Sequence, residues 1–254
     1  MSNLNPRQSE AVRYIDGPLL VLAGAGSGKT RVITQKIAHL IQNCGISAKN
    51  IAAVTFTNKA AREMRDRVAQ LLDGKEGRGL RVSTFHTLGL DIIRRELATL
   101  GYKAGFSIFD ASDSATLIRE LLRREAVGDD MEKEVQRHIS NWKNAFITPA
   151  QALASAEDPL AHAAATLYEA YNRHLKAYNA VDFDDLIMLP VLLFEEHPEV
   201  LERWQQRVRY LLVDEYQDTN ATQYRLVKLL IGLNGRLTVV GDDDQSIYAW
   251  RGAQ

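Results

Sequence analysis

The stretch "LAGAGSGKTRV" at residues 22–32 constrains the fold more than any other feature of the sequence. Gly24, Gly26 and Gly28 stand between the apolar run "PLLVLAG" and a helical pattern at residues 29–43. The apolar run predicts a strand buried on both faces, as in a parallel sheet. Glycines at such a junction let an anion approach the backbone N–H groups and the helix N-terminus. We therefore expect an α/β fold with a phosphate-binding loop.

The same stretch follows the nucleotide-binding pattern G-x-x-x-x-G-K-[ST], except that Ala23 stands at its first position. In this pattern Lys29 reaches the β- and γ-phosphates, and the Thr30 hydroxyl ligates Mg²⁺. The rest of the loop would surround the phosphates with backbone N–H groups; it comprises Ala23, Gly24, Ala25, Gly26, Ser27 and Gly28. The sequence therefore predicts a site for a nucleoside triphosphate with magnesium.

Strand and helix patterns alternate at both ends of the chain. Apolar runs predict further strands at 51–56, 80–85, 209–215 and 236–242, and helical periodicity predicts helices at 58–72, 198–208 and 220–231. Such alternation is typical of a parallel sheet with helices on both faces. Residues 86–189 carry helical patterns only, which predicts an all-helical insertion. The predicted division is 1–85 and 190–254 for the α/β domain, and 86–189 for the inserted subdomain.

An acidic pair ends one of the predicted strands, in "LLVDEYQDT". Asp214 would hold the magnesium shell, which is the usual role of this aspartate beside a phosphate-binding loop. Glu215 would orient or deprotonate the attacking water. Acidic pairs after strands are common, so this pair alone would be weak evidence. Together with the loop it predicts hydrolysis of ATP, with Lys29 and Glu215 among the catalytic residues.

The segment "VVGDDDQSIYAWRGA" at 239–253 follows the last predicted strand. Gln245 can hydrogen-bond a γ-phosphate and respond to its loss, which makes it a candidate catalytic residue. Tyr248 and Trp250 lie two residues apart beside this sensor, and aromatic side chains of this kind stack on the bases of single strands. An isolated aromatic pair often fills a core, but the surrounding glycines, aspartates and Arg251 favour an exposed surface.

Seven blocks in a fixed order resemble the motifs of superfamily 1A DNA helicases, the UvrD/Rep group. They are "LNPRQSEAV", "AGAGSGKTRV", "VTFTNKAAREM", "STFHTLGLDIIR", "VDFDDLI", "VDEYQDTN" and "GDDDQSIYAWRGA", and together they span the chain. The resemblance implies a RecA-like domain 1A interrupted by a subdomain 1B. It also implies ATP and Mg²⁺ as cofactors and movement along single-stranded DNA in the 3′ to 5′ direction.

The resemblance also assigns roles to single residues. Gln8 would read the adenine edge, and Arg31 would stack on the adenine ring. A path for single-stranded DNA would be lined by Phe56, Asn58, Thr84, His86, Tyr248, Trp250 and Arg251. From its sequence position alone, His86 is equally compatible with a core or capping role, and Phe56 with simple packing. The three carboxylates of "DFDDLI" (182–187) would repel DNA, which favours a structural and capping role for them.

Motifs IV to VI of these helicases, which carry arginine fingers, have no counterpart in the sequence. We therefore expect an N-terminal half whose partners are single-stranded DNA, the second RecA-like domain, and proteins of replication or repair. Alone, it should bind ATP weakly and unwind little. The alternative is a nucleotide-regulated module that binds single-stranded DNA without motor activity. A helicase–nuclease subunit would need a nuclease domain, and a small-molecule kinase offers no reason for Tyr248 and Trp250.

Composition restricts the partners. The 31 basic and 32 acidic residues nearly cancel, so a nucleic acid must be bound by a local groove rather than by a global positive field. No apolar run approaches membrane-spanning length. The single Cys44 excludes an internal disulfide and fits a reducing compartment. These features predict a cytoplasmic protein with no membrane partner.

Overall fold

The computed structural model describes residues 4–22, 28–125, 128–233 and 235–242, with the side chain of residue 129 left out. The chain forms two compact units. The sheet unit holds the described residues of Met1–Leu88, His197–Thr219 and Val227–Gln254, and the helical unit holds those of Gly89–Glu196 and Asn220–Leu226.

The sheet unit is built on five parallel strands in the order β1-β7-β6-β2-β3. The bounds are Leu19–Leu22 for β1, Leu237–Gly241 for β7, Tyr210–Val213 for β6, Ile51–Thr55 for β2 and Arg81–Thr84 for β3. All neighbouring pairs run parallel, so the carboxyl ends of all five strands meet at one edge. The predicted parallel α/β fold is therefore confirmed.

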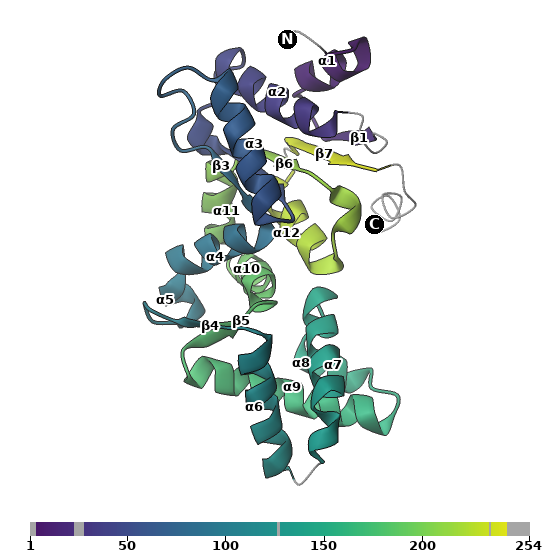
Figure 1. Cartoon of the computed structure of the whole chain (residues 1–254). Coiled ribbons are helices and arrows are strands. Elements are labelled where there is room, and N and C mark those ends of the chain that lie inside the picture. The colour runs from purple at the N-terminus through teal and green to yellow at the C-terminus, as the bar shows by residue number, and fades with distance from the viewer. Residues whose placement is uncertain (1–3, 23–27, 126–127, 234, 243–254) are drawn as a thin grey trace. The chain divides into compact units, whose positions relative to one another are not determined.

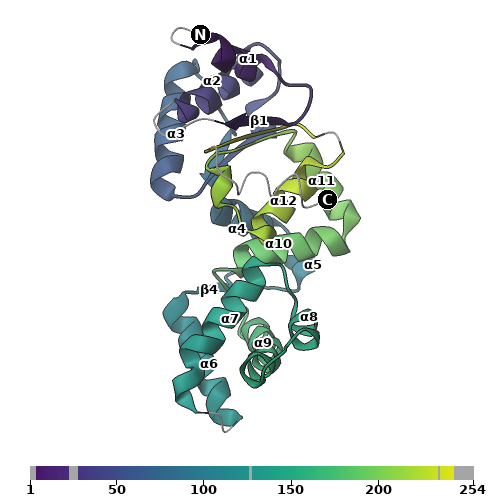
Figure 2. The ribbon, with the colours of Figure 1, turned by 90° about the vertical axis from the view of Figure 1, so that its right-hand side faces the viewer.

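Helices cover both faces of this sheet (Figures 1 and 2). On one face, α2 (Lys29–Gln42) and α3 (Asn58–Leu71) bury apolar side chains against β2, β6 and β7. Helix α1 (Pro6–Arg13) packs against α2. The other face carries α11 (Pro198–Arg207) and the last residues of α12 (Ala221–Ile231). Within α2, the side chains of Val32, Ile33, Ile37 and Leu40 are buried.

Strand β1 differs from its prediction. Its residues are half-buried, and Leu22 is 42% exposed, whereas the apolar run predicted burial on both faces. The reason is its place at the edge of the sheet, where it has only β7 as a neighbour. An uninterrupted apolar run cannot tell an edge strand from a central one.

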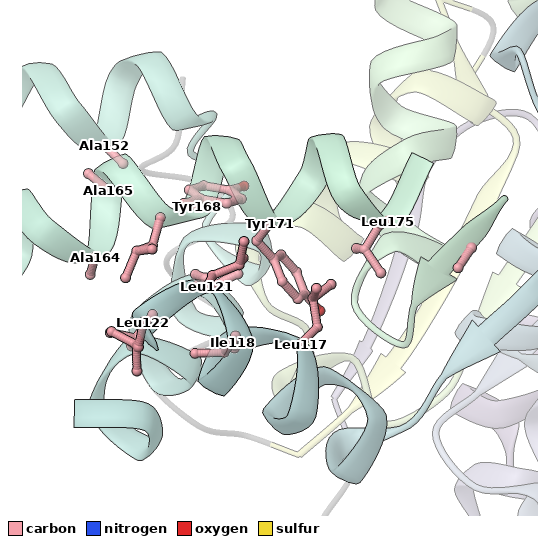
Figure 3. Packing of buried hydrophobic residues seen from close by; sticks show 14 residues of the cluster. Leu117, Ile118, Leu121, Leu122, Ala152, Ala164, Ala165, Tyr168, Tyr171 and Leu175 are labelled. Atoms are coloured by element: carbon pink, nitrogen blue, oxygen red, sulfur yellow. The ribbon is translucent and has the colours of Figure 1, made fainter. Parts of the chain in front are cut away.

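The helical unit contains helices of 4 to 19 residues. They are the end of α4 (Phe85–Arg95), α5 (Leu97–Leu100), α6 (Ala111–Arg124), α7 (Glu132–Asn144), α8 (Pro149–Ala154), α9 (Pro159–Ala177) and α10 (Asp185–Glu196). Their main core joins α6 to α9: Figure 3 shows Leu117 and Leu121 facing Tyr168 and Tyr171. None of the helices in the described part of the chain combines the length and apolar character that a membrane crossing requires.

The prediction of an all-helical insertion is wrong in one respect. β4 (Ser107–Phe109) and β5 (Ala180–Asp182) form a two-stranded parallel sheet within the helical unit. Each strand has three residues, which is too short for an alternating pattern to emerge from the sequence. The unit also extends to residue 196, because α10 belongs to it, whereas the predicted insertion ended at 189.

The carboxylates of "DFDDLI" are structural, as predicted. Lys143 on α7 is fully buried and its Nζ donates at 2.8 Å to both Asp182 and Asp185. The two aspartates also accept from each other's backbone N–H, at 2.8 and 3.1 Å, which caps the start of α10. The Tyr171 hydroxyl donates to Asp182 at 2.8 Å. The Asp184 carboxylate accepts from Ser140 at 2.8 Å.

Gly89 marks a close backbone contact in the same unit. A Cβ built on this residue of α4 would lie 1.7 Å from the carbonyl oxygen of Leu186 on α10. Only a residue without a side chain permits this approach, because both neighbouring atoms belong to the backbone. The glycine therefore fixes how closely α4 and α10 pack.

Candidate functional site

The described residues of the predicted phosphate and magnesium site lie at the carboxyl edge of the sheet unit. Gly28 caps the amino end of α2 with a φ of +79°, which strongly favours glycine, and Lys29 is the first residue of the helix. Asp214 directly follows β6, and Asp242 directly follows β7. Since β7 lies between β1 and β6, the chain brings the helix start and both carboxylates to one place.

Lys29 is held there by a carboxylate. Its Nζ forms an ion pair with Asp242, and its side chain is only 11% exposed. Asp242 was not predicted as a site residue, although it belongs to the quoted motif "GDDDQ". A triphosphate at Gly28 would compete with Asp242 for Lys29, because both offer anionic oxygens to the same ammonium group.

Asp214 is nearly buried, with 5% of its surface exposed. Burial raises the pKa of its carboxyl group; the backbone N–H of Glu215, which donates to Asp214 Oδ1 at 2.9 Å, and the charge of Lys29 act in the opposite direction. A buried carboxylate whose ionised form is disfavoured gains most from a nearby cation. The position therefore suits a ligand of a magnesium shell.

Glu215 adopts a left-handed backbone conformation, with φ of +51°. Such a conformation is uncommon for residues other than glycine and costs on the order of 1 kcal/mol or more. The Glu215 carboxylate accepts a hydrogen bond from Gln217 Nε2 at 2.6 Å. Gln217 also contacts Asp242: its Oε1 accepts from the Asp242 N–H at 3.0 Å, and its Nε2 lies 3.4 Å from the carboxylate. Gln217 thus links the acidic pair to the end of β7, a role that sequence reasoning missed.

The donor set fits Mg²⁺ bound with a triphosphate. Thr30 and Asp214 offer hard oxygen ligands, and Mg²⁺ in such sites is completed by phosphate oxygens and water. Among the described residues, no group of three or more histidine, cysteine or acidic side chains is placed to hold a metal. A magnesium site here would therefore depend on the nucleotide for most of its ligands.

Gln8, the predicted adenine contact, caps the start of a helix in the structure. It forms a capping box at the start of α1, where its Oε1 accepts from Asn5 N–H at 3.0 Å and Asn5 Oδ1 accepts from Gln8 N–H at 2.8 Å. Its Nε2 lies 3.4 Å from where a Gly28 Cβ would be. The adenine-reading candidate therefore lies directly beside the phosphate-binding turn. Arg31, the other predicted adenine contact, is exposed on α2.

The predicted DNA contacts that the structure describes lie farther along the same edge. Phe56 and Asn58 follow β2. Thr84 is the last residue of β3, and His86 is the second residue of α4. These two strands are paired neighbours, with Thr55 opposite Thr84. The sheet order therefore sets this group beside Asp214, on the side away from β7.

The residues of this group differ in exposure and in the contacts that they make. Asn58 is exposed. The Phe56 ring is half-buried and packs 5.3 Å from the Phe85 ring at 56°. Thr84 is 7% exposed, and its hydroxyl accepts from the Thr87 N–H at 3.1 Å at the start of α4. Burial lowers the pKa of His86, so its imidazole favours the neutral form.

Other predicted site residues lie outside the described part of the chain. They are Ala23, Gly24, Ala25, Gly26 and Ser27 of the loop, and Gln245, Tyr248, Trp250 and Arg251 after β7. Their predicted roles stay predictions.

Comparison with known proteins identifies relatives along the whole chain. The family described as "UvrD/REP helicase N-terminal domain" matches residues 4–254. The ATP-dependent DNA helicase Rep of Salmonella typhimurium and that of Escherichia coli are each 61% identical over 253 residues, which cover 99% of the chain. The ATP-dependent DNA helicase PcrA of Staphylococcus aureus is 48% identical over 257 residues, covering 100% of it.

The chain spans little more than a third of these relatives. The matched segments make up 37% of each Rep protein and 35% of PcrA. The similarity therefore concerns the amino-terminal domain that the family describes.

Proposed function

Because the chain belongs to the UvrD/REP helicase N-terminal domain family, we propose that it is the ATP-binding half of a DNA helicase motor. In this proposal the motor couples ATP hydrolysis to movement on single-stranded DNA in the 3′ to 5′ direction. The direction follows from the family resemblance. The activity is that of the relatives, whose names describe ATP-dependent DNA helicases.

The observation that carries the proposal is the convergence of Lys29, Asp214 and Glu215 at the carboxyl edge of β6. Bound Mg²⁺ would neutralise charge on the transferred phosphoryl group. Lys29 would leave Asp242 to hold the β- and γ-phosphates, and Thr30 with Asp214 would orient the metal's shell. Glu215, fixed by Gln217, would accept a proton from the attacking water.

Single-stranded DNA would run past the ends of β2 and β3. Phe56 and Asn58 would contact it from β2, and Thr84 and His86 from β3. The Asp214 N–H donates to the Val54 carbonyl of β2 at 2.9 Å, which supports this arrangement, because a change at the nucleotide can reach the DNA path through neighbouring backbone. Tyr248, Trp250 and Arg251 would extend the path, and Gln245 would report the γ-phosphate to them.

The two units would correspond to domains 1A and 1B. Full turnover would require a second RecA-like domain, because the arginine fingers of the family lie there and such a finger is worth 10³–10⁵ in rate. The chain alone should therefore hydrolyse ATP slowly and unwind little. We place the protein in the cytoplasm, on the basis of its single cysteine, with replication or repair proteins as further partners.

The experiment measures ATP hydrolysis with and without single-stranded DNA, and DNA affinity by fluorescence anisotropy. The wild-type chain should show slow hydrolysis that DNA stimulates. Lys29→Ala should abolish it and leave DNA affinity within about twofold. Lys49→Ala is the control, because this exposed lysine lies in the short helix before β2, at the opposite edge of the sheet. DNA binding without any hydrolysis in the wild type would instead support the alternative, a nucleotide-regulated DNA-binding module.

A further inference from the structure

Lys36 is a buried cation that the proposed mechanism does not use. It lies on α2, two helical turns after Lys29, and its residue is 0% exposed. Its Nζ donates to the carbonyl oxygens of Ala11 at 2.9 Å and Tyr14 at 2.6 Å. It also lies 5.5 Å from the centre of the Tyr210 ring.

The two carbonyls belong to the last turn of α1 and its C-cap. Carbonyl groups at this end of a helix have no partner within the helix, and the helix dipole favours a positive charge there. Lys36 therefore ties the carboxyl end of α1 to the middle of α2. Because α1 has only eight residues, its orientation depends on such tertiary contacts rather than on its own stability.

A buried lysine at this position carries a cost as well as two hydrogen bonds. Burial lowers the pKa of Lys36 to about 8, which shows that the charged form is disfavoured there. An apolar side chain of similar length would avoid the cost of burying the charge, but it would leave the carbonyl groups of Ala11 and Tyr14 without this donor. Two directed hydrogen bonds, in contrast, fix where α1 lies along α2. Burial of an apolar side chain such as Val12 is not directional and does not by itself select the register of the two helices.

The other end of α1 carries Gln8. Its amide nitrogen lies beside Gly28, the N-cap of α2 at the phosphate-binding turn. Gln8 and Ala11 are one helical turn apart, about 4.5 Å along the axis. If the hydrogen bond from Lys36 to the Ala11 carbonyl is lost, α1 can tilt or slide on α2. Gln8 would then move relative to the phosphate site about as far as Ala11 moves.

We propose that Lys36 is a positioning residue for adenine recognition: it docks α1 on α2 so that Gln8 meets the base of a nucleotide whose phosphates lie at Gly28 and Lys29. This inference rests on the proposed ATP-binding function and on the adenine contact that the family resemblance implies for Gln8. Lys36 should affect binding of the base but not binding of the phosphates, since it lies two helical turns along α2 from Lys29.

The test measures the affinities of the magnesium complexes of fluorescent ATP and GTP analogues for the 254-residue chain. Magnesium tripolyphosphate, as a competitor, reports the phosphate site alone. Lys36→Met should weaken ATP and reduce the preference for ATP over GTP at least fivefold. GTP and tripolyphosphate should stay within about twofold of wild type. Lys36→Arg, which keeps the charge and the donors, should retain most of the preference.

Controls separate positioning from a loss of stability. Ile37→Val removes one methylene from the adjacent, fully buried residue and should lower the melting temperature without changing the ATP/GTP ratio. If Lys36→Met does not fold, Lys36→Gln replaces it, because the shorter amide cannot hold both carbonyls. An unchanged ratio in the folded variant would overturn the inference.

The variant Gln8→Ala separates the role inferred for Lys36 from the adenine contact of Gln8 on which it depends. Loss of the preference in Gln8→Ala but not in Lys36→Met would refute the role of Lys36 and keep that of Gln8. An unchanged preference in Gln8→Ala would refute the role of Gln8, and with it the inference. Loss in both, with tripolyphosphate binding intact, is the expected result.

Discussion

Replacing Lys143 with methionine should destabilise the helical unit strongly and in a manner that depends on pH. The ammonium group is fully buried and shared by Asp182 and Asp185, whose side chains are 8% and 7% exposed. Removing one partner of a buried ion pair typically costs about 3–5 kcal/mol, because a charge is left without compensation. Here two carboxylates would be left facing each other, so we expect the upper part of that range at pH 8.

The pH dependence follows from proton binding. In wild type, Lys143 lowers the pKa of Asp182, against the effect of burial. Without Lys143, two buried carboxylates so close together cannot both stay ionised, and the folded variant retains a proton on the pair. The unfolded chain has already lost this proton above pH 5. Since the folded state binds more protons, its stability falls as pH rises, by about 1.4 kcal/mol per pH unit.

Hydrogen exchange of the α9 amides is a suitable assay, because it reports opening of the helical unit separately from that of the sheet unit. The destabilisation by Lys143→Met should be about 2–3 kcal/mol smaller at pH 6.5 than at pH 8.5, since one proton is bound across two pH units. The triple variant with Asp182→Asn and Asp185→Asn removes the stranded charges and should recover much of the stability at pH 8.5. Exchange of the α2 amides serves as the internal control. A cost below about 1 kcal/mol, or one independent of pH, would refute this reasoning.

Two further predictions concern packing and catalysis. Gly89→Ala should destabilise the helical unit by more than about 2 kcal/mol in thermal unfolding, because its Cβ would meet the Leu186 carbonyl at 1.7 Å. Around Gly74 the space is open but the φ is positive, so Gly74→Ala should cost only the backbone strain of about 1–2 kcal/mol; equal costs would contradict the close contact. Gln217→Ala should lower kcat for ATP hydrolysis about 10- to 100-fold with little change in KM, because the Glu215 carboxylate loses its hydrogen bond while the phosphate-binding turn is unchanged. A rise in KM at constant kcat would instead place Gln217 in nucleotide binding.

The parts of the candidate site that lie close together in sequence are the ones for which the sequence alone supports a prediction. Lys29 and Thr30 follow a glycine-rich turn between strand and helix, and this local order is itself the physical requirement for binding phosphate. Asp214 was found because an acidic residue ends a buried strand. Asp242 was missed, since its contact with Lys29 depends on β7 lying between β1 and β6, and strand order in a parallel sheet is not encoded in any single segment.

Buried lysines show a second limit of prediction from sequence. The reason for this limit differs between Lys143 and Lys36. A lysine on a helix is normally taken as solvated, because leaving the ammonium unpaired in the interior is costly. For Lys143, the sequence shows the carboxylates of the ion pair, since "DFDDLI" contains more of them than a helix start needs. It does not show that the lysine that pairs with Asp182 lies 39 residues away. For Lys36 the partners are backbone carbonyls 22 and 25 residues away, and every residue carries such a group. The residue types of Ala11 and Tyr14 therefore do not indicate that their carbonyl groups bind a lysine. Only the packing of α1 on α2 shows this contact.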